Sequence, residues 1–600
     1  FLLPWADFKR WDWVPRVSAQ WDLAIWKMYM SLKPGADAAT AEAKAAGLVK
    51  HYAPDTYASF KREPMFFAMK DWHLYTEFKD GRPSGGLIDS VRMFSIVGVL
   101  VLLIACINFM NLSTARSERR AKEVGVRKVI GSSRRGLIFQ FLIESVVMTT
   151  MAFVLSLLAT VAVLPAFRAM TGEAISIPWG SGAFWLLMMG YVVLTGLLAG
   201  ARPAFYLSSF QPVKVLKGTM RIGRAAAWPR KVLVVLQFTC SIALIIGTVI
   251  VYQQIQYAKD RPRGYDPNRL LVTAYYGENY PAQKQDILRT GAVTNMTKSL
   301  GSTTEVYGHE TVDQWPGWQA GEAILPVIRP ISDSDYFRTL GMQFVAGSNF
   351  TGNFGADTTC VIFNEAAVKR MRLEQPINQY VHWQTVTAPS RLRIIGVVKD
   401  ALSNNPFAEA EPAMYLFQPG WAGRLLFRLS PTVSTPVALA RIKAVHDQYD
   451  KEHPFEYRFV DQDYASGFAA EETIGKLAGV FAGLAIFISC LGLFGLAAYM
   501  AEQRRKEIGL RKVLGASVGQ MVVLLSGDFL LLVGVSCVIA SPVAYYFLHH
   551  WLAGYYYRIT INPVVFVVAG SMAIVITALT VGSQAVKSAL MNPVKSLRSE

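Results

Sequence analysis

Two acidic residues lie inside long apolar runs, and they are the first candidates for chemistry. Glu144 and Asp528 each follow a Gly-x-Ser triplet at the same spacing. A carboxylate inside a membrane span is costly, so such a residue is a functional hypothesis by default. Two interpretations stay open. One is a proton relay, and the other is a structural brace in which the carboxylate is hydrogen-bonded to neighbouring helices.

The rest of the sequence carries no recognisable catalytic motif. Its eight histidines are scattered, and neither a His-Glu-x-x-His motif nor a cysteine cluster occurs. A phosphate-binding loop needs glycines ahead of a Gly-Lys-[Ser/Thr] triplet, whereas the Gly-Lys pair of this chain, Gly475–Lys476, is followed by Leu477. We therefore expect no catalytic residue, no metal and no cofactor here. Any ATP hydrolysis must belong to a separate chain.

A basic sequence punctuated by glycines occurs twice, as RRAKEVGVRKVIGSS at 119–133 and as RRKEIGLRKVLGAS at 504–517. A constant offset of 384 residues aligns the copies, and a Pro-Val-Lys tail recurs at 210–218 and 591–599. Similarity at this density indicates a duplicated module. The candidate site residues are the shared positions of the two copies: Glu123, Gly125, Arg127, Lys128 and Gly131, and Glu507, Gly509, Arg511, Lys512 and Gly515.

Each copy predicts a short amphipathic helix, over 117–131 and 501–515. Val126, Val129 and Ile130 fall on one stripe at helical spacing. Such a helix is either an interfacial anchor whose basic residues face lipid headgroups, or a docking element for a cytoplasmic partner. The glycine in the middle of each helix costs about 1 kcal/mol relative to alanine. It favours docking, because a missing side chain permits close approach.

The ends of these helices are also predicted. Each copy places an acid one helical turn before an arginine, which favours an ion pair on the helix surface. Each then has a glycine suited to a helix C-cap and a serine suited to the N-cap of the next helix. These positions are Glu123–Arg127, Gly131 and Ser133, and Glu507–Arg511, Gly515 and Ser517. In the second copy, Gln520 completes a capping-box pattern.

The composition indicates a membrane protein. A chain that is 52% hydrophobic and yet has a net charge of +17 fits a soluble globular protein poorly. Uncharged apolar runs of about 20 residues predict membrane-spanning helices. They lie at 94–113, 145–167, 183–201, 232–253, 477–500, 529–548 and 564–586.

The positive charge predicts the orientation. The excess of Lys and Arg is concentrated in segments 114–135, 202–231, 501–518 and the tail after 586. Basic residues next to spans stay in the cytoplasm, so 1–91 and about 254–476 are expected outside. Because the basic segments are short and abut spans, we expect no nucleic-acid partner. Anionic membrane lipids are a secondary partner of these segments.

The external segments predict mixed α/β domains. Apolar and β-branched runs indicate strands at 269–276, 360–364, 392–398 and 424–430, with helices at 365–371 and 436–450. Residues 25–54 parallel the strand and helix around 436–450, so the external domain is expected to be duplicated too. Four of the five cysteines lie in predicted spans, and Cys360 alone lies outside, so no disulfide is expected within the external domains.

The predicted organisation is an α-helical membrane protein with α/β (α+β) extracytoplasmic domains and a duplicated module. The first module lacks a leading span, so we expect a piece of a longer protein, with seven spans of an inferred eight. The predicted parts are the end of a first external domain (1–91), a first module (92–217), a basic linker (218–231), a span (232–253), a second external domain (254–474) and a second module (475–600).

These motifs together resemble permeases of the MacB/FtsX type, or type VII ABC transporters. The resemblance rests on K-E-[VI]-G-[VL]-R-K-V-[IL]-G-[AS]-S, on the Pro-Val-Lys tails, and on DSDYFRTLGMQFVAGSNF (333–350), VIFNEAAVKRM and IIGVVKD in the external segment. It runs over essentially the whole chain.

The resemblance implies an inner-membrane permease that works by mechanotransmission. In that family, cytoplasmic ABC ATPase subunits bind ATP and magnesium, hold the two amphipathic coupling helices and drive motion of the external domains. It implies two ATPase copies, an external adaptor or substrate, and export or extraction of an amphiphilic compound or peptide. Two alternatives stay open: an FtsX-like transducer that activates an external hydrolase without transport, and a membrane sensor or scaffold without an ATPase.

Overall fold

The computed structural model describes residues 5–10, 14–15, 28–54, 63–79, 81–172, 174–208, 224–277, 279–319, 322–384, 390–403, 406–421 and 423–590. Two compact units make up the chain, Phe1–Val99 and Leu100–Glu600. Within the described residues, seven helices are long and apolar enough to cross a membrane. The seven predicted spans are therefore confirmed.

The first unit contains short elements ahead of the first membrane helix. They are α1 (Trp5–Phe8), α3 (Ala38–Ala45), α4 (Leu48–Tyr52), a 3-10 turn (Met69–Asp71) and the antiparallel pair β1 (Glu77–Lys79) and β2 (Arg82–Gly85). The described part of 25–54 contains α3 and α4 but no strand. Gly47, at φ +85°, separates the two helices, because a left-handed residue interrupts the helical hydrogen bonds.

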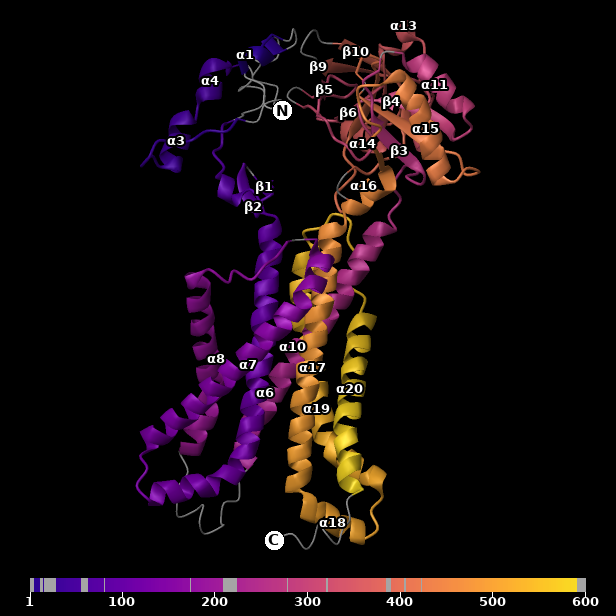
Figure 1. Cartoon of the computed structure of the whole chain (residues 1–600). Coiled ribbons are helices and arrows are strands. Elements are labelled where there is room, and N and C mark those ends of the chain that lie inside the picture. The colour runs from indigo at the N-terminus through magenta and orange to yellow at the C-terminus, as the bar shows by residue number, and fades with distance from the viewer. Residues whose placement is uncertain are drawn as a thin grey trace. The chain divides into compact units, whose positions relative to one another are not determined.

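The long apolar runs form the helices of the membrane region, as Figure 1 shows. In chain order they are α6 (Leu87–Val129), α7 (Arg134–Thr171), α8 (Gly182–Ser208), α10 (Arg224–Lys259), α17 (Ala469–Gln503), α19 (Val518–Leu552) and α20 (Val564–Ala589). The short α18 (Arg505–Val513) lies between α17 and α19. Each long helix satisfies its own backbone groups, which hydrocarbon requires.

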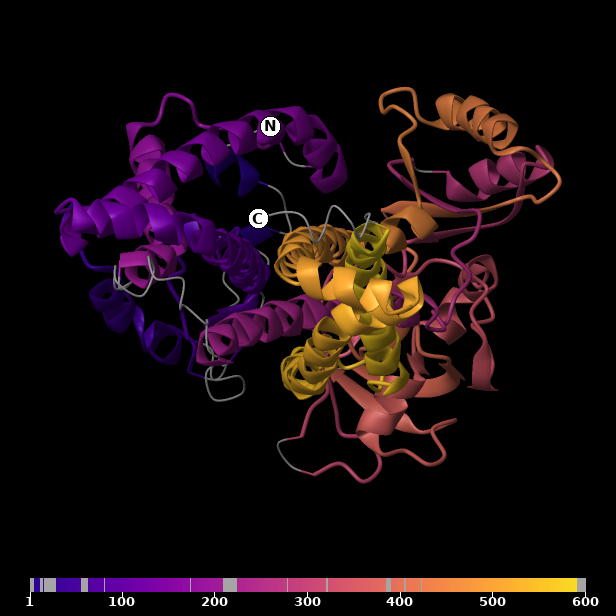
Figure 2. The ribbon, with the colours of Figure 1, turned by 90° about the horizontal axis from the view of Figure 1, so that it is seen from below.

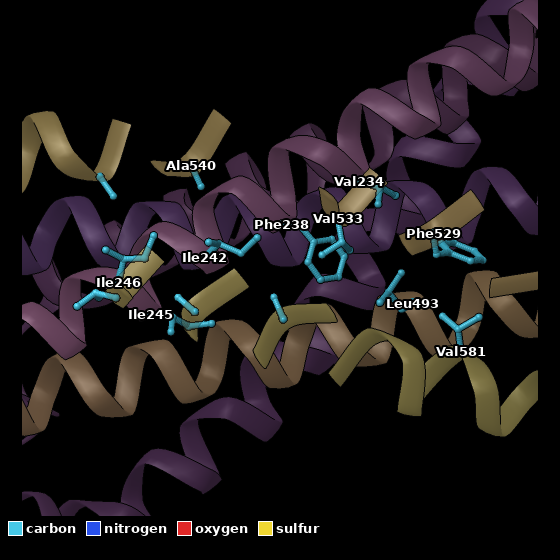
Figure 3. Close-up of a cluster of buried hydrophobic side chains, with 14 of the residues drawn as sticks. Val234, Phe238, Ile242, Ile245, Ile246, Leu493, Phe529, Val533, Ala540 and Val581 are labelled. Atoms are coloured by element: carbon cyan, nitrogen blue, oxygen red, sulfur yellow. The ribbon is translucent and has the colours of Figure 1, made fainter. Parts of the chain in front are cut away.

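The second module is a bundle in which α10 packs against α17, α19 and α20. Figure 2 shows these helices gathered together when viewed along the bundle. In its core, Phe238 and Ile242 of α10 lie with Leu493 of α17 and Val533 of α19 (Figure 3). The hydroxyls of Ser241 and Ser489 are 2.9 Å apart in the same bundle. Tight packing and hydrogen bonds of this kind hold helices together in a membrane.

The second external domain is built on one mixed sheet, with 11 strands among the described residues in the order β13-β3-β12-β4-β6-β11-β8-β10-β9-β5, and with β7 paired to β10. The strands are β3 (Leu270–Ala274), β4 (Val293–Ser299), β5 (Thr311–Asp313), β6 (Val327–Ile331), β7 (Phe344–Gly347), β8 (Cys360–Asn364), β9 (Tyr380–Gln384), β10 (Ser390–Val398), β11 (Ala413–Phe417), β12 (Arg424–Leu429) and β13 (Tyr457–Phe459). All four predicted strands are confirmed.

Helices cover this sheet. They are α11 (Tyr280–Arg289), α12 (Tyr336–Leu340), α13 (Phe354–Asp357), α14 (Glu365–Met371), α15 (Thr435–Tyr449) and α16 (Val460–Ser466). The central strands β6, β8 and β11 are buried along their whole length, which is typical of strands covered on both faces. The helices predicted at 365–371 and 436–450 correspond to α14 and α15.

A polar cluster ties the start of α11 to the sheet. Asp333 accepts hydrogen bonds from Thr297 Oγ1 (2.7 Å) and from Lys284 Nζ (2.8 Å). It also accepts one from the hydroxyl of Tyr280. Burial raises the pKa of Tyr280, and the neighbouring Asp333 carboxylate raises it further. The DSDYF segment at the start of 333–350 is thus a structural contact inside the external domain.

Candidate functional site: the two cytoplasmic helix ends

The two copies of the repeated sequence are positioned by equivalent apolar clusters. The first joins Val124 of α6 to two residues of α7 and one of α8, and the second joins Ile508 of α18 to two residues of α19 and one of α20. The members are Val124, Leu137, Phe141 and Ala204 in the first cluster, and Ile508, Met521, Leu525 and Ala585 in the second. They correspond residue by residue under the repeat, so the duplication extends to three-dimensional packing.

The other face of each helix end is uncovered. Three apolar side chains per copy point away from the chain, with closely matched exposures. Val126, Val129 and Ile130 are 47%, 64% and 79% exposed, and their counterparts Leu510, Val513 and Leu514 are 56%, 63% and 77% exposed. We call these two sets the exposed stripes.

A Schellman motif ends each helix, as the glycines predict. Gly131 and Gly515 adopt φ values of +103° and +92°, in the left-handed region where glycine carries no Cβ penalty. In each copy the glycine amide and the next amide turn back to carbonyls of the last turn. These bonds are Gly131 to Lys128 (3.2 Å) and Ser132 to Arg127 (2.9 Å), and Gly515 to Lys512 (3.1 Å) and Ala516 to Arg511 (3.0 Å).

The next helix starts on a serine in both copies. The hydroxyl of Ser133 accepts the Gly136 amide at 3.1 Å. The hydroxyl of Ser517 accepts the Gln520 amide at 3.3 Å, and Gln520 Oε1 accepts the Ser517 amide at 3.0 Å. The predicted capping box is therefore confirmed. Because cap and glycine adjoin, the turn between each helix end and the next membrane helix is fixed at both sides.

Charged residues of the repeat make side-chain contacts in both copies. Arg511 pairs with Glu507 at 2.8 Å, as predicted. In the first copy, the side chain of Glu123 lies outside the described residues, and Arg127 Nη1 donates to Gln140 Oε1 at 3.0 Å. Lys128 Nζ donates to the Ser208 carbonyl at the end of α8 (2.8 Å).

Two details differ from the predictions. In the first copy the predicted separate helix is continuous with the span, since α6 runs unbroken over Leu87–Val129. No glycine or proline lies between the apolar run and the repeat in this copy, so a continuous helix is sterically allowed. In the second copy, Gly509 is buried against the chain itself. The close approach that its missing side chain permits is therefore internal, and the exposed stripe is the surface open to a partner. Gly125 is helical, and its burial lies outside the described residues.

The two intramembrane carboxylates lie on corresponding membrane helices, α7 and α19. Asp528 Oδ2 on α19 lies 3.6 Å from Arg504 Nη2, at the junction of α17 and α18. This ion pair holds the start of α18 to the next membrane helix, an arrangement that favours the brace interpretation. Glu144 is exposed on α7. The proton-relay interpretation stays untested for both residues.

A second group of residues, which the sequence reasoning missed, lies at the outer ends of the membrane helices. The buried side chain of Gln254 on α10 holds the loop between α19 and α20 by both ends of its amide. Gln254 Nε2 donates to the Tyr557 carbonyl (2.8 Å), and Gln254 Oε1 accepts the Ile559 amide (2.9 Å). The ring of Tyr557 also stacks on Tyr257, with centroids 4.5 Å apart.

The same loop is fastened to the external domain. The Tyr557 amide donates to the carbonyl of Phe407 (3.2 Å), which lies between β10 and β11. The guanidinium of Arg261 lies 4.6 Å from the Tyr557 ring centroid and donates to two carbonyls flanking Phe407. The ring of Phe407 is buried beside Phe468, which precedes α17. We call Gln254, Arg261, Phe407 and Tyr557 the outer joint.

One further contact strengthens the outer joint. Tyr556 donates a hydrogen bond to Glu409 Oε1 at 2.8 Å, and this bond to the carboxylate raises the pKa of Tyr556. The only sequence signal of the joint is the run of three tyrosines, 555–557, just after an apolar span. That run is equally typical of an aromatic belt at a membrane surface.

Comparisons with known proteins match the two segments that contain the helix ends. The sequence family described as FtsX-like permease C-terminal matches residues 95–212 and 479–593, which hold the two helix ends. The chain is 28% identical over 125 residues to the macrolide export ATP-binding/permease protein MacB of Bdellovibrio bacteriovorus, covering 21% of this chain and 19% of that protein. It is 31% identical over 110 residues to the uncharacterized ABC transporter permease YvrN of Bacillus subtilis, covering 18% of this chain and 26% of that one.

The aligned region thus spans about a fifth to a quarter of each curated relative. Among solved structures, the periplasmic region of MacB from Actinobacillus actinomycetemcomitans is similar at 13% identity and a TM-score of 0.26, covering 35% of this chain and 96% of that one.

Proposed function

We propose that this multi-pass membrane chain with two FtsX-like modules is a permease of the MacB/FtsX type, the membrane subunit of an ABC-type system driven by a separate ATPase. One ATPase subunit binds each cytoplasmic helix end, and ATP-driven closure of the ATPase pair moves the membrane helices. The external domain follows that motion and exports or extracts an amphiphilic compound or peptide. The curated relatives named as ABC components support this proposal.

The observation that carries the proposal is the pair of exposed stripes. Both copies present three apolar side chains in the same order and with nearly the same exposures, on helix ends fixed by the same cap. Apolar patches that recur on a rigid frame mark interaction surfaces. Since the opposite face of each helix end is buried in its own module, a force applied to a stripe is delivered to the membrane helices.

The outer joint connects the membrane helices to the external domain, at the opposite end of the bundle from the stripes. It fixes one external loop, around Phe407, to the outer ends of α10, α17 and the α19–α20 loop. Motion of the second module is thereby passed to β10 and β11 through hydrogen bonds and stacked rings. The same path serves a transducer that activates an external hydrolase, which stays the alternative within the family.

The test introduces aspartate into the stripes. One variant carries Val129→Asp and Ile130→Asp, a second carries Val513→Asp and Leu514→Asp, and a third carries all four changes. Each is co-expressed with the candidate ABC ATPase subunits of its host, and ATPase recovery and MgATP hydrolysis are measured on the purified permease. Burying a charge without a partner is strongly unfavourable, so each two-site variant should retain one ATPase and the four-site variant none.

Val345→Asp is the matched control, because Val345 is 52% exposed in β7 of the external domain. It should leave ATPase recovery unchanged. If a well-folded four-site variant recovers as much ATPase as the unmodified protein, the stripes do not bind the ATPase, and the helix ends are interfacial anchors instead. Binding without any stimulation of hydrolysis in the unmodified protein would favour a scaffold.

A further inference from the structure

The two modules differ in the polarity of two corresponding positions in their equivalent helices. Residues 106–112 read CINFMNL, and the equivalent residues 490–496 read CLGLFGL. Both asparagines of the first copy therefore have glycine as counterpart, Asn108 against Gly492 and Asn111 against Gly495. These positions lie in the middle of α6 and α17, the corresponding helices of the two modules.

In the structure, these corresponding positions meet. Asn108 Nδ2 donates to the Ile488 carbonyl on α17 at 3.1 Å. A Cβ placed on Gly492 would lie 2.1 Å from Asn108 Oδ1, and a Cβ placed on Gly495 would lie 2.3 Å from Leu112 Cδ2. The side chains of α6 thus occupy the space that side chains on α17 would need.

Contact between a residue and its own counterpart is the mark of a two-fold interface. In a symmetric pair of modules the same residue would stand on both sides. Two asparagines would compete for one space, whereas two glycines would leave a void. The mixed arrangement, with side chains on one helix and glycines on the other, avoids both.

The asparagines are costly where they stand. Asn111 is 0% exposed, and among the described residues neither polar atom of its amide has a hydrogen-bond partner. Asn108 Oδ1 is also buried without one. An unpaired amide in a membrane interior destabilises the fold. Polar residues in an apolar seam are known to select one pairing over others at a cost in stability.

We propose that the Asn108–Gly492 contact, with Leu112 against Gly495, is a lock that pairs the first module with the second module of the same chain and disfavours pairing between copies. A pair of first modules would oppose asparagine to asparagine, and a pair of second modules would oppose glycine to glycine. The mixed pair gains the close contact and the Ile488 hydrogen bond, which neither pair of like modules makes. Specificity comes from this difference in free energy between mixed and like pairs. This inference goes beyond the proposed function, since it concerns the permease alone.

The test exchanges the asparagine and the glycine between positions 108 and 492. Gly492→Asn opposes two asparagines, Asn108→Gly opposes two glycines, and the double variant restores a mixed pair with its partners exchanged. The apparent unfolding temperature of the purified full chain is measured without any ATPase. Each single change should lower it, and the double variant should regain most of the loss of Gly492→Asn. Such non-additivity is the signature of direct contact.

Gly483→Asn is the control, because Gly483 lies on the same helix and a Cβ added there would meet no atom within 4 Å. It adds the same amide to the same helix away from the contact, so Gly492→Asn should lower the unfolding temperature clearly more than Gly483→Asn does. The inference is overturned if Gly492→Asn behaves like Gly483→Asn, or if the two single effects simply add. A native mass measurement provides an independent check: the unmodified permease should be monomeric, and a stable dimer of chains would overturn the lock.

Discussion

At the scale of single residues, the clearest sequence signals are those that depend on a few neighbours. The glycine C-caps, the serine N-caps and the capping box of Gln520 all follow from hydrogen bonds spanning at most one turn. They could be predicted because no distant contact is needed to form them. Gly509 shows the opposite case. It is buried next to Ile508, which packs against residues of α19 and α20, and the local sequence does not reveal such contacts.

The C-cap glycines lead to a prediction about strain. Gly131 and Gly515 have positive φ values and open space where a Cβ would stand. Alanine there should therefore cost about 1–2 kcal/mol through backbone strain alone, without any steric clash. We expect Gly515→Ala to lower the apparent unfolding temperature of the purified permease and to loosen the turn before α19.

The control for that strain is Gly534→Ala in the middle of α19, where a Cβ also meets open space but the backbone is helical. Alanine is the better helix former by about 1 kcal/mol, so this change should be neutral or stabilising. If Gly515→Ala and Gly534→Ala lower the unfolding temperature equally, the left-handed backbone of Gly515 is not the cause of the destabilisation.

At the scale of elements, the seven spans and four strands could be predicted because their patterns are long and apolar. The break between α17 and α18, and its absence in α6, could not be predicted. The copies differ at most positions just before the repeat, and neither has a glycine or a proline there that would mark a break. The outer joint was also beyond prediction, because its members are separated by hundreds of residues in the chain.

The outer joint yields a prediction about local opening. Replacing Gln254 by leucine keeps the volume but leaves the Tyr557 carbonyl and the Ile559 amide without their partner. Losing a buried hydrogen bond of this kind costs about 1–3 kcal/mol. Amide hydrogen exchange in 555–561 should accelerate, and mass spectrometry of that peptide provides the measurement.

Gln253 offers the matched control for this element. It is the same residue type, one position earlier on α10, and it is exposed. Gln253→Leu should leave the exchange of 555–561 as in the unmodified protein. If Gln254→Leu does the same, the loop is held by the stacked rings and the Phe407 contact, and the amide of Gln254 is dispensable.

At the scale of the whole molecule, duplication explains more than any single motif. It predicts two equivalent helix ends, and the matched clusters around Val124 and Ile508 confirm them in three dimensions. It would also predict the same residues on α6 and α17 where these two helices meet. The exchange of asparagine for glycine between α6 and α17 departs from that symmetry. The structure explains it, because Asn108 occupies the space beside Gly492.

The two-module chain leads to a prediction of stoichiometry. If each exposed stripe binds one ATPase and the modules pair within one chain, the complete complex should contain one permease and two ATPases. The permease alone should hydrolyse no ATP, because its sequence lacks a phosphate-binding loop. Native mass spectrometry of the purified complex measures the first expectation, and a turnover assay on ATPase-free permease measures the second.

The possible outcomes separate the two proposals. A complex of two permeases and two ATPases would mean that each chain engages a single ATPase, which contradicts the lock between modules but leaves ATPase coupling intact. A single permease that binds no ATPase, even with unmodified stripes, would contradict the coupling but leave the lock standing. One permease with two ATPases, reduced to one by aspartates in either stripe, is the result expected if both hold, because each helix end then serves one subunit of a pair that must meet to close.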